Sequence, residues 1–227
     1  MSVLRPCRAV IFDMDGVLLD TEPLYTQATN TVLAPFGQRL TWELKRQIMG
    51  REPLFGAELV LSSLDVALEP LVYLEQVDVE LRRLLLDTQA MPGAEQWLAE
   101  LRGQGVPIAV GTSSSRERFE LKTRRHPWLR EVSPVICGDD RRVESRKPAP
   151  DIFLAAAADL GVAPAHCLVF EDAPSGVAAA RAAGMQVVAI AAEGVGQEAL
   201  AQADVVIWGY SDLRREMFQF LKSGDCH

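Results

Sequence analysis

The chain has 227 residues, of which 48% are hydrophobic and 24% are charged, a composition typical of a globular protein with a sizeable core. Its 31 acidic and 23 basic residues give a net charge of −8, which argues against binding to nucleic acid or to a membrane surface. No signal peptide or membrane span is expected before the first apolar run. The four cysteines form no C-x-x-C pair, so we expect a reducing, cytoplasmic location.

The first 88 residues predict one strand followed only by helices. The strand covers residues 8–13, where an apolar run ends in two carboxylates and a glycine. Apolar residues then recur at helical spacing, and this pattern predicts helices over 24–36, 41–49, 54–64 and 68–86. A helical stretch of about 70 residues is too long for a loop. We therefore predict a separate helical domain over residues 20–88.

Strands and helices alternate in the rest of the chain. Strands are expected over 107–111, 132–137, 166–170, 186–191 and 204–207. Helices are expected over 94–102, 116–124, 152–160, 174–183 and 211–222. This alternation predicts an α/β fold with a doubly wound, mostly parallel sheet. Residues 1–19 and 89–227 are expected to form this core.

Polar side chains stand at the ends of the predicted strands or in the loops that follow them: Asp13 and Asp15, Thr112 and Ser113, Lys147, and Glu171 and Asp172. In an open α/β sheet, ligands bind beyond the carboxyl ends of the strands. If the strands are neighbours, these groups meet at one edge. Together they have the chemistry needed for phosphoryl transfer to a carboxylate.

Each acid has an expected role in such a reaction. Asp13 would be the nucleophile that forms an aspartyl-phosphate. Asp15 would protonate the leaving oxygen and then deprotonate the attacking water. Asp13 and Asp172, with Asp15 beside them, are the expected ligands of a Mg2+ ion, because Mg2+ prefers carboxylate oxygen. Glu171 is expected to support these ligands without touching the substrate.

The remaining candidates would bind the transferring oxygens. Lys147 supplies positive charge, and the Thr112 hydroxyl and the backbone near Ser113 supply hydrogen bonds. Taken singly, each motif has an ordinary explanation. The serine run after Thr112 is typical of a helix cap, and Glu171 with Asp172 suits a helix N-terminus. The order of all four signals, each near a strand end, favours the catalytic interpretation.

Four segments resemble the motifs of the haloacid dehalogenase superfamily: residues 12–17 (FDMDGV), 112–113 (TS), 147–151 (KPAPD) and 170–176 (FEDAPSG). The resemblance covers essentially the whole chain. It implies a Mg2+-dependent phosphotransferase with a helical cap inserted after the first motif. The implied substrate is a small phosphorylated metabolite, with pseudouridine 5′-phosphate as the specific candidate. A dehalogenase has no acid at the position of Asp15, so dehalogenation is not expected.

Two alternatives within the superfamily stay open. A phosphosugar mutase of the β-phosphoglucomutase type carries a histidine where this chain has Tyr25. A phenol does not replace imidazole as a proton carrier near neutral pH, and this difference favours hydrolysis. A catalytically silent phosphate-binding relative is the second alternative, although no expected catalytic side chain is missing.

Several cationic side chains are weaker candidates. Arg51 is the candidate for reaching from the cap into the substrate pocket, and a solvated arginine is the plain alternative. Arg116, Lys122 and Arg146 are candidates for positive charge near the phosphate, which spacing alone does not decide. We expect a monomer.

Overall fold

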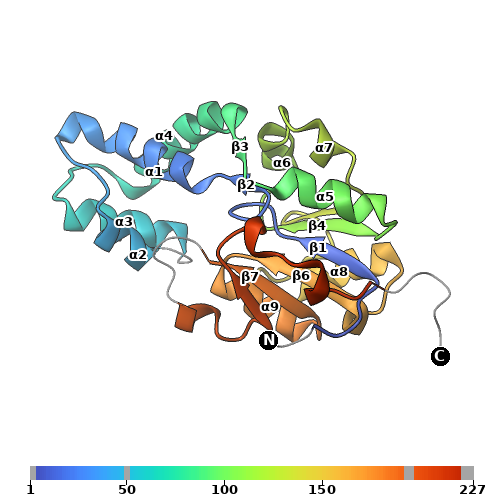
Figure 1. Cartoon of the computed structure of the whole chain (residues 1–227). Helices are drawn as coiled ribbons and strands as arrows, with labels where there is room; N and C mark the ends of the chain where they lie inside the picture. Colours follow the sequence, from blue (N-terminus) through green and yellow to red (C-terminus); the bar gives the residue numbers. More distant parts are fainter. Residues whose placement is uncertain (1–3, 49–51, 192–196, 221–227) are drawn as a thin grey trace. The chain divides into compact units, whose positions relative to one another are not determined.

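The computed structural model describes residues 4–48, 52–191 and 197–220. The chain divides into two compact units, drawn in Figure 1. Residues 1–20 and 89–227 form one unit, which we call the core unit. Residues 21–88 form the other, which we call the helical unit. No helix in the described residues combines the length and apolar character needed to cross a membrane.

Six parallel strands of the described residues form the central sheet of the core unit, in the order β5-β4-β1-β6-β7-β8. Their bounds are β1 Ala9–Phe12, β4 Ile108–Thr112, β5 Val135–Cys137, β6 Cys167–Glu171, β7 Gln186–Ile190 and β8 Val205–Ile207. The prediction of a doubly wound parallel sheet is confirmed. The chain crosses from β4 and β5 on one side of β1 to β6 on the other, so the strand order reverses at β1. Ligands bind at such a reversal.

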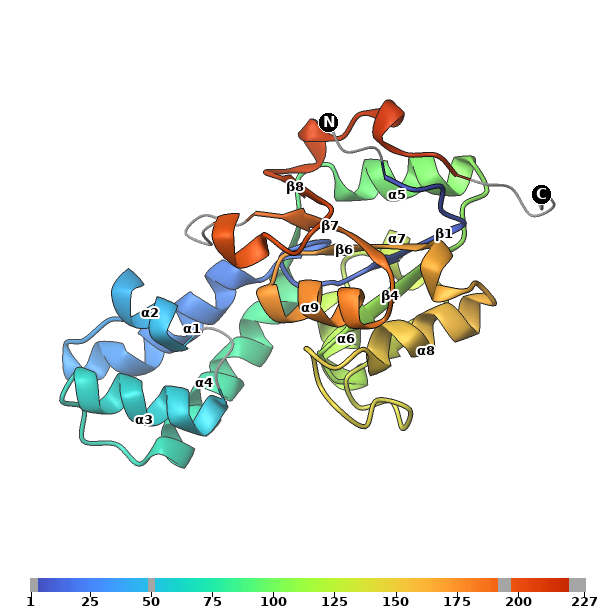
Figure 2. The same cartoon turned by 90° about the horizontal axis from the view of Figure 1, so that it is seen from below.

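Helices cover both faces of this sheet, as Figure 2 shows for α5 on one face and α8 and α9 on the other. The helices of the core unit are α5 Ala94–Gly103, α6 Arg116–Lys122, α7 Pro127–Arg130, α8 Asp151–Leu160 and α9 Pro174–Ala182. Phe12 and Phe170 stack at 4.9 Å between ring centres on the α5 face. Burying one such ring stabilises the fold by about 1.5–3 kcal/mol. Because both faces are covered, β1 and β6 are apolar along their length.

The helical unit contains α1 Glu22–Leu33, α2 Trp42–Ile48, α3 Pro53–Ser63 and α4 Pro70–Leu84, with short 3-10 turns at Ala34–Phe36 and Leu85–Asp87. The predicted helices over 24–36, 54–64 and 68–86 therefore exist, each within a few residues of its expected bounds. Helix α2 begins at the expected place, and residue 49 lies outside the described residues. The unit has its own apolar core, in which Leu33, Val60 and Tyr73 are buried.

The end of the core unit differs from its prediction. A helix was expected over 211–222, but the described residues form two 3-10 turns, Tyr210–Asp212 and Arg215–Met217, followed by extended chain. Phe218 and Phe220 lie two positions apart in this segment, and their rings stack with 5.9 Å between the ring centres. Phe220 pairs with Cys7 in a parallel bridge. The segment is therefore extended, held by the bridge to Cys7 just before β1 and by the stacked aromatic rings.

Short elements were also missed. No strand was expected between residues 13 and 89, yet β2 Leu19–Asp20 pairs with β3 Gln89–Ala90 in a two-stranded antiparallel ribbon. Helix α7 falls between the helix expected over 116–124 and the strand expected over 132–137, where no element was predicted. Elements of two to four residues are too short to produce a periodic pattern. The ribbon joins the two points at which the chain leaves and re-enters the core unit.

Candidate functional site

Three neighbouring strands end in polar residues at the same edge of the sheet. In the register of the sheet, Phe12 of β1 lies beside Val110 of β4 and Phe170 of β6. Asp13 follows directly, and its backbone N–H donates to the Phe170 carbonyl at 2.9 Å. Thr112 closes β4 and Glu171 closes β6. The expected convergence of the strand ends is therefore present.

Lys147 reaches this edge from the loop between β5 and α8. Its ammonium Nζ donates to Asp13 Oδ1 at 2.5 Å, to Glu171 Oε1 at 2.7 Å and to the Gly111 carbonyl at 3.2 Å. The side chain is 7% exposed. Burial alone would lower the pKa of Lys147, but the two carboxylates outweigh it and raise the pKa above its usual range. Lys147 therefore stays positively charged between Asp13 and Glu171.

The electrostatics of Asp13 follow from its burial. Loss of water raises the pKa of Asp13 from 3.8 to about 7, Lys147 opposes the rise, and Glu171 and Asp15 add to it. Asp172 behaves similarly, because burial, Glu171 and Asp13 together raise its pKa well above the usual value. Burial and the repulsion between these carboxylates therefore outweigh the opposing effect of Lys147 on both pKa values.

Glu171 ties Lys147 to the start of helix α9. One carboxylate oxygen accepts from Lys147, and the other accepts from the backbone N–H groups of Asp172 at 2.8 Å and Ala173 at 2.9 Å. Gly176 makes room for this arrangement, since a Cβ there would lie 1.6 Å from Glu171 Oε1. Glu171 is almost fully buried, at 1% exposure, so its position is set by these four groups.

Asp15 has different partners. Lys122 Nζ lies 2.6 and 2.8 Å from its two carboxylate oxygens, and the Ser114 hydroxyl donates to Oδ2 at 3.2 Å. The turn after Asp15 uses Gly16 with a φ of +73°, a conformation that glycine adopts without strain. A Cβ on Gly16 would lie 2.0 Å from Asp172 Oδ2. Glycine at this position therefore lets the Asp172 carboxylate approach the loop.

The other predicted residues are placed as follows. Thr112 is fully buried, and its hydroxyl oxygen accepts from the Ser114 N–H at 3.1 Å. Ser113 is exposed beside it. The Arg116 guanidinium does not contact these residues and donates instead to the Val135 carbonyl at 2.7 Å. Arg51 lies outside the described residues.

The serine run also contains a true helix cap. Ser115 precedes α6, and its hydroxyl oxygen accepts from the Arg118 N–H at 3.3 Å. Ser115 therefore caps the helix, whereas Ser114 contacts Asp15. Sequence reasoning did not separate them, and it did not pair Lys122 with Asp15. No local signal could have done so, because those partners are 107 positions apart in the sequence.

The donors at this edge suit a hard cation. In residues 4–48, 52–191 and 197–220, no three or more His, Cys, Asp and Glu side chains are grouped as a metal site. The Asp172 carboxylate nevertheless has no hydrogen bond or ion pair within the described residues, and its pKa is raised partly by Asp13. A divalent cation held by oxygen ligands would offset that repulsion. Asp172, together with Asp13, whose charge contributes to that rise, therefore fits such an ion.

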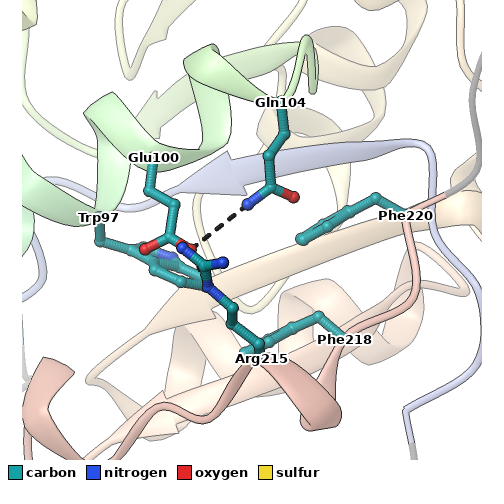
Figure 3. A pocket seen from close by; sticks show the side chains of 6 residues that line it. All are labelled: Trp97, Glu100, Gln104, Arg215, Phe218 and Phe220. Carbon is teal, nitrogen blue, oxygen red and sulfur yellow. Dashed lines mark hydrogen bonds and ion pairs between the residues drawn. The ribbon is translucent and has the colours of Figure 1, made fainter.

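A cavity of about 330 Å³ lies away from these residues (Figure 3). It is lined by Trp97 and Glu100 of α5, by Gln104 directly after that helix, and by Arg215, Phe218 and Phe220 of the last described segment. Figure 3 shows the Gln104 side chain directed toward Glu100. None of the predicted site residues lines this cavity. The polar edge of the sheet is therefore the better candidate for the active site.

Comparison with known proteins agrees with this choice. A family model for haloacid dehalogenase-like hydrolases matches residues 7–184, which include every candidate residue of the sheet edge. The chain belongs to the haloacid dehalogenase-like hydrolase family. This membership confirms the resemblance carried by the four motifs.

Two relatives of this hydrolase are named as phosphatases. A probable pseudouridine-5′-phosphatase of Drosophila melanogaster is 42% identical over 223 residues, covering 96% of each chain. The (DL)-glycerol-3-phosphatase 1, mitochondrial, of Arabidopsis thaliana is 38% identical over 224 residues, covering 96% of this chain and 75% of the relative. The chain is thus an enzyme, a phosphatase of the haloacid dehalogenase-like family.

Solved structures share the fold. A haloacid dehalogenase family hydrolase from Deinococcus radiodurans R1, crystallised with phosphate and sodium, superposes with a TM-score of 0.78 at 31% identity. The match covers 92% of this chain and 94% of that one. The likeness therefore extends well beyond the motifs to the whole architecture.

Proposed function

We propose that the chain is a Mg2+-dependent phosphomonoesterase that works through a phosphorylated Asp13. The observation that carries this proposal is the Asp13–Lys147–Glu171 cluster at the ends of β1 and β6. A buried carboxylate beside a lysine that stays charged is suited to attack phosphorus and to hold the phosphoryl oxygens. The family supports the same reaction class.

In the first half-reaction, an Asp13 oxygen bonds to phosphorus while the bond from phosphorus to the ester oxygen breaks. Asp15 gives its proton to that leaving oxygen, and the alcohol departs. Lys147 and Thr112 hold the transferring oxygens. Asp13 and Asp172 would bind Mg2+, which supplies positive charge to the phosphoryl group.

In the second half-reaction, Asp15 takes a proton from water as the water oxygen bonds to phosphorus. The bond between phosphorus and Asp13 breaks, which releases phosphate and restores both carboxyl groups. Asp15 suits this exchange with water because its side chain is 30% exposed, compared with 9% for Asp13. One acid is closed off and the other is accessible.

The substrate in this proposal is a small phosphorylated metabolite, with pseudouridine 5′-phosphate as the specific candidate. The Drosophila relative supports this choice by its name, and the Arabidopsis relative makes glycerol 3-phosphate the natural competitor. We assign substrate selection to the helical unit, in agreement with the cap that the family resemblance implies. The free thiols of Cys7, Cys137 and Cys167 support a reducing, cytoplasmic location.

A phosphate-release panel with Mg2+ tests the proposal. It includes pseudouridine 5′-phosphate, uridine 5′-phosphate, glycerol 3-phosphate, phosphoglycolate and β-glucose 1-phosphate, with Asp13→Asn as the matched control. Preference for pseudouridine 5′-phosphate supports the specific substrate, and broad slow hydrolysis supports only the reaction class. Conversion of β-glucose 1-phosphate to glucose 6-phosphate favours a mutase despite Tyr25. A folded protein with no activity favours the silent relative.

A further inference from the structure

Lys122 is a buried lysine that belongs to none of the four motifs. It is the last residue of α6, and its side chain is 0% exposed. A buried ammonium costs several kcal/mol unless charged or polar partners compensate. Here the compensation comes from Asp15, whose two carboxylate oxygens lie 2.6 and 2.8 Å from Nζ. The fold therefore places the Lys122 amino group against both oxygens of the Asp15 carboxylate.

Ser114 completes the arrangement. Lys122 donates to the Ser114 hydroxyl oxygen at 2.8 Å, and that hydroxyl donates to Asp15 Oδ2 at 3.2 Å. The three side chains form a closed triangle in which both oxygens of Asp15 are held. We call Lys122 and Ser114 the Asp15 clamp. Lys147, the other buried lysine of this edge, contacts Asp13 and Glu171. Each of the two lysines therefore pairs with different acids.

We infer that the Asp15 clamp is a positioning device that aims the Asp15 carboxyl group at the leaving oxygen of the substrate. This inference rests on the proposed function, in which Asp15 delivers that proton. Proton transfer needs heavy atoms within about 2.6–3.2 Å of each other. A displacement of about 1 Å can reduce the rate by about 10²-fold. Lys122 thus acts through Asp15 and not on the substrate.

The leaving group separates positioning from plain structural support. An alkyl phosphate such as glycerol 3-phosphate needs a proton on its departing oxygen. In p-nitrophenyl phosphate the departing phenolate is stable as an anion, so the proton matters little. Comparing kcat/KM confines the test to steps up to the phosphorylation of Asp13, and breakdown of the aspartyl-phosphate does not enter the comparison.

The decisive variant is Lys122→Met, which keeps an unbranched side chain one atom shorter than lysine and removes the amino group. We expect kcat/KM for glycerol 3-phosphate to fall by about 10- to 10²-fold, and kcat/KM for p-nitrophenyl phosphate to fall by less than about threefold. Lys122→Arg, which keeps the charge, should recover part of the loss. Arg181→Met removes a cation from the Arg181–Asp204 pair of the same unit and should change neither value.

Asp15→Asn, measured beside these variants, distinguishes the failure of this inference from failure of the proposed function. If Asp15→Asn discriminates between the two substrates and Lys122→Met does not, Asp15 keeps its role and the clamp inference is overturned. If Asp15→Asn does not discriminate either, the role of Asp15 in the proposed function fails, and the clamp inference fails with it. Equal losses on both substrates in Lys122→Met would mean structural support only.

Ser114→Ala keeps the inference testable if Lys122→Met does not fold. It removes one hydrogen bond to Asp15 without leaving a buried charge unpaired. We expect a loss of about three- to tenfold in kcat/KM that is confined to glycerol 3-phosphate, which corresponds to one hydrogen bond. An unchanged ratio between the two substrates in a folded Ser114→Ala protein would overturn the inference.

Discussion

Two aspartates separated by a single residue occupy very different surroundings in this protein. The Asp13 side chain is 9% exposed, and its partner is Lys147 from the loop after β5. The Asp15 side chain is 30% exposed, and its partners are Lys122 and Ser114 from the α6 region. The same residue type thus meets two different environments within one turn of chain.

The difference shows how one short loop can supply two chemistries. A closed carboxylate is shielded from water, which suits a nucleophile that must react with phosphorus. An accessible carboxylate can exchange protons with the leaving group and with water. Pairs of acids whose environments differ in this way mark acid and nucleophile roles in other hydrolases. Four variants test this difference.

Asp13→Asn removes the nucleophile and should have the largest effect. An amide is a poor nucleophile toward phosphorus, so we expect no measurable turnover of any phosphomonoester. Circular dichroism and thermal melting should show a folded protein, because the amide has nearly the same volume and can still accept from Lys147. Turnover by a folded Asp13→Asn enzyme would exclude the covalent route.

Asp15→Asn keeps the nucleophile and removes the proton donor. General acid–base catalysis contributes about 10²–10⁴-fold, and we expect kcat to fall within that range. Steady-state kinetics with a saturating alkyl phosphate measures this loss. A rate within about threefold of the wild-type value would remove Asp15 from the role, because that change is well below the range for general acid–base catalysis.

Asp172→Asn tests the proposed Mg2+ site beside the buried Asp13. Mg2+ at 100 times its dissociation constant should stabilise the wild-type protein by about 2.7 kcal/mol. The variant should lose this stabilisation together with its activity. Urea unfolding with Mg2+ or with a chelator measures the difference. Equal stabilisation of both proteins by Mg2+ would place the ion elsewhere.

The same variant has a pH signature without metal. Burial raises the folded-state pKa of Asp172 above its unfolded value, and that of Asp13 from 3.8 to about 7. A carboxyl group whose pKa is higher in the folded than in the unfolded protein contributes stability that is fully present below its unfolded-state pKa. This stability is lost as the pH rises through its folded-state pKa. In a chelator, Asp172→Asn should therefore be more stable than the wild type at about pH 8, and the advantage should shrink toward about pH 4.

Gly176→Ala should give the smallest of these effects, through displacement of Glu171. The added Cβ would lie 1.6 Å from Glu171 Oε1, so the carboxylate must move away from Lys147. Leaving a buried group without its partner costs about 1–3 kcal/mol of unfolding free energy. Gly103→Ala is the matched control, because no atom lies within 4 Å of its added Cβ. Equal stability of the two variants would contradict the importance of this close approach.

Much of the core unit could be predicted from local patterns. The apolar runs of β1 and β6 and the polar residues that end them are visible in the sequence, and a parallel sheet brings such ends together. The helix predicted over residues 211–222 was wrong. In the structure, Phe218 stacks on Phe220 and Phe220 forms a bridge to Cys7, and these contacts hold the segment in an extended conformation. Packing partners from distant parts of the chain decide such segments.

The candidate site was predictable in the same uneven way. Asp13, Thr112 and Glu171 end strands, so their meeting point follows from topology. The partner of Asp15 does not, because Lys122 lies on a helix 107 residues away and only its side-chain direction brings it there. Long-range pairing of charged side chains leaves no periodic trace in the sequence.

Trapping the phosphorylated enzyme gives a direct test of Asp13 as the nucleophile. Wild-type protein turning over a phosphomonoester with Mg2+ is quenched in acid, digested, and analysed by peptide mass. We predict one added phosphoryl group on the peptide that contains Asp13, removable by hydroxylamine as expected for an acyl phosphate. Steady turnover with no phosphoryl group on that peptide at any quench time, together with residual activity in Asp13→Asn, would contradict a covalent role for Asp13.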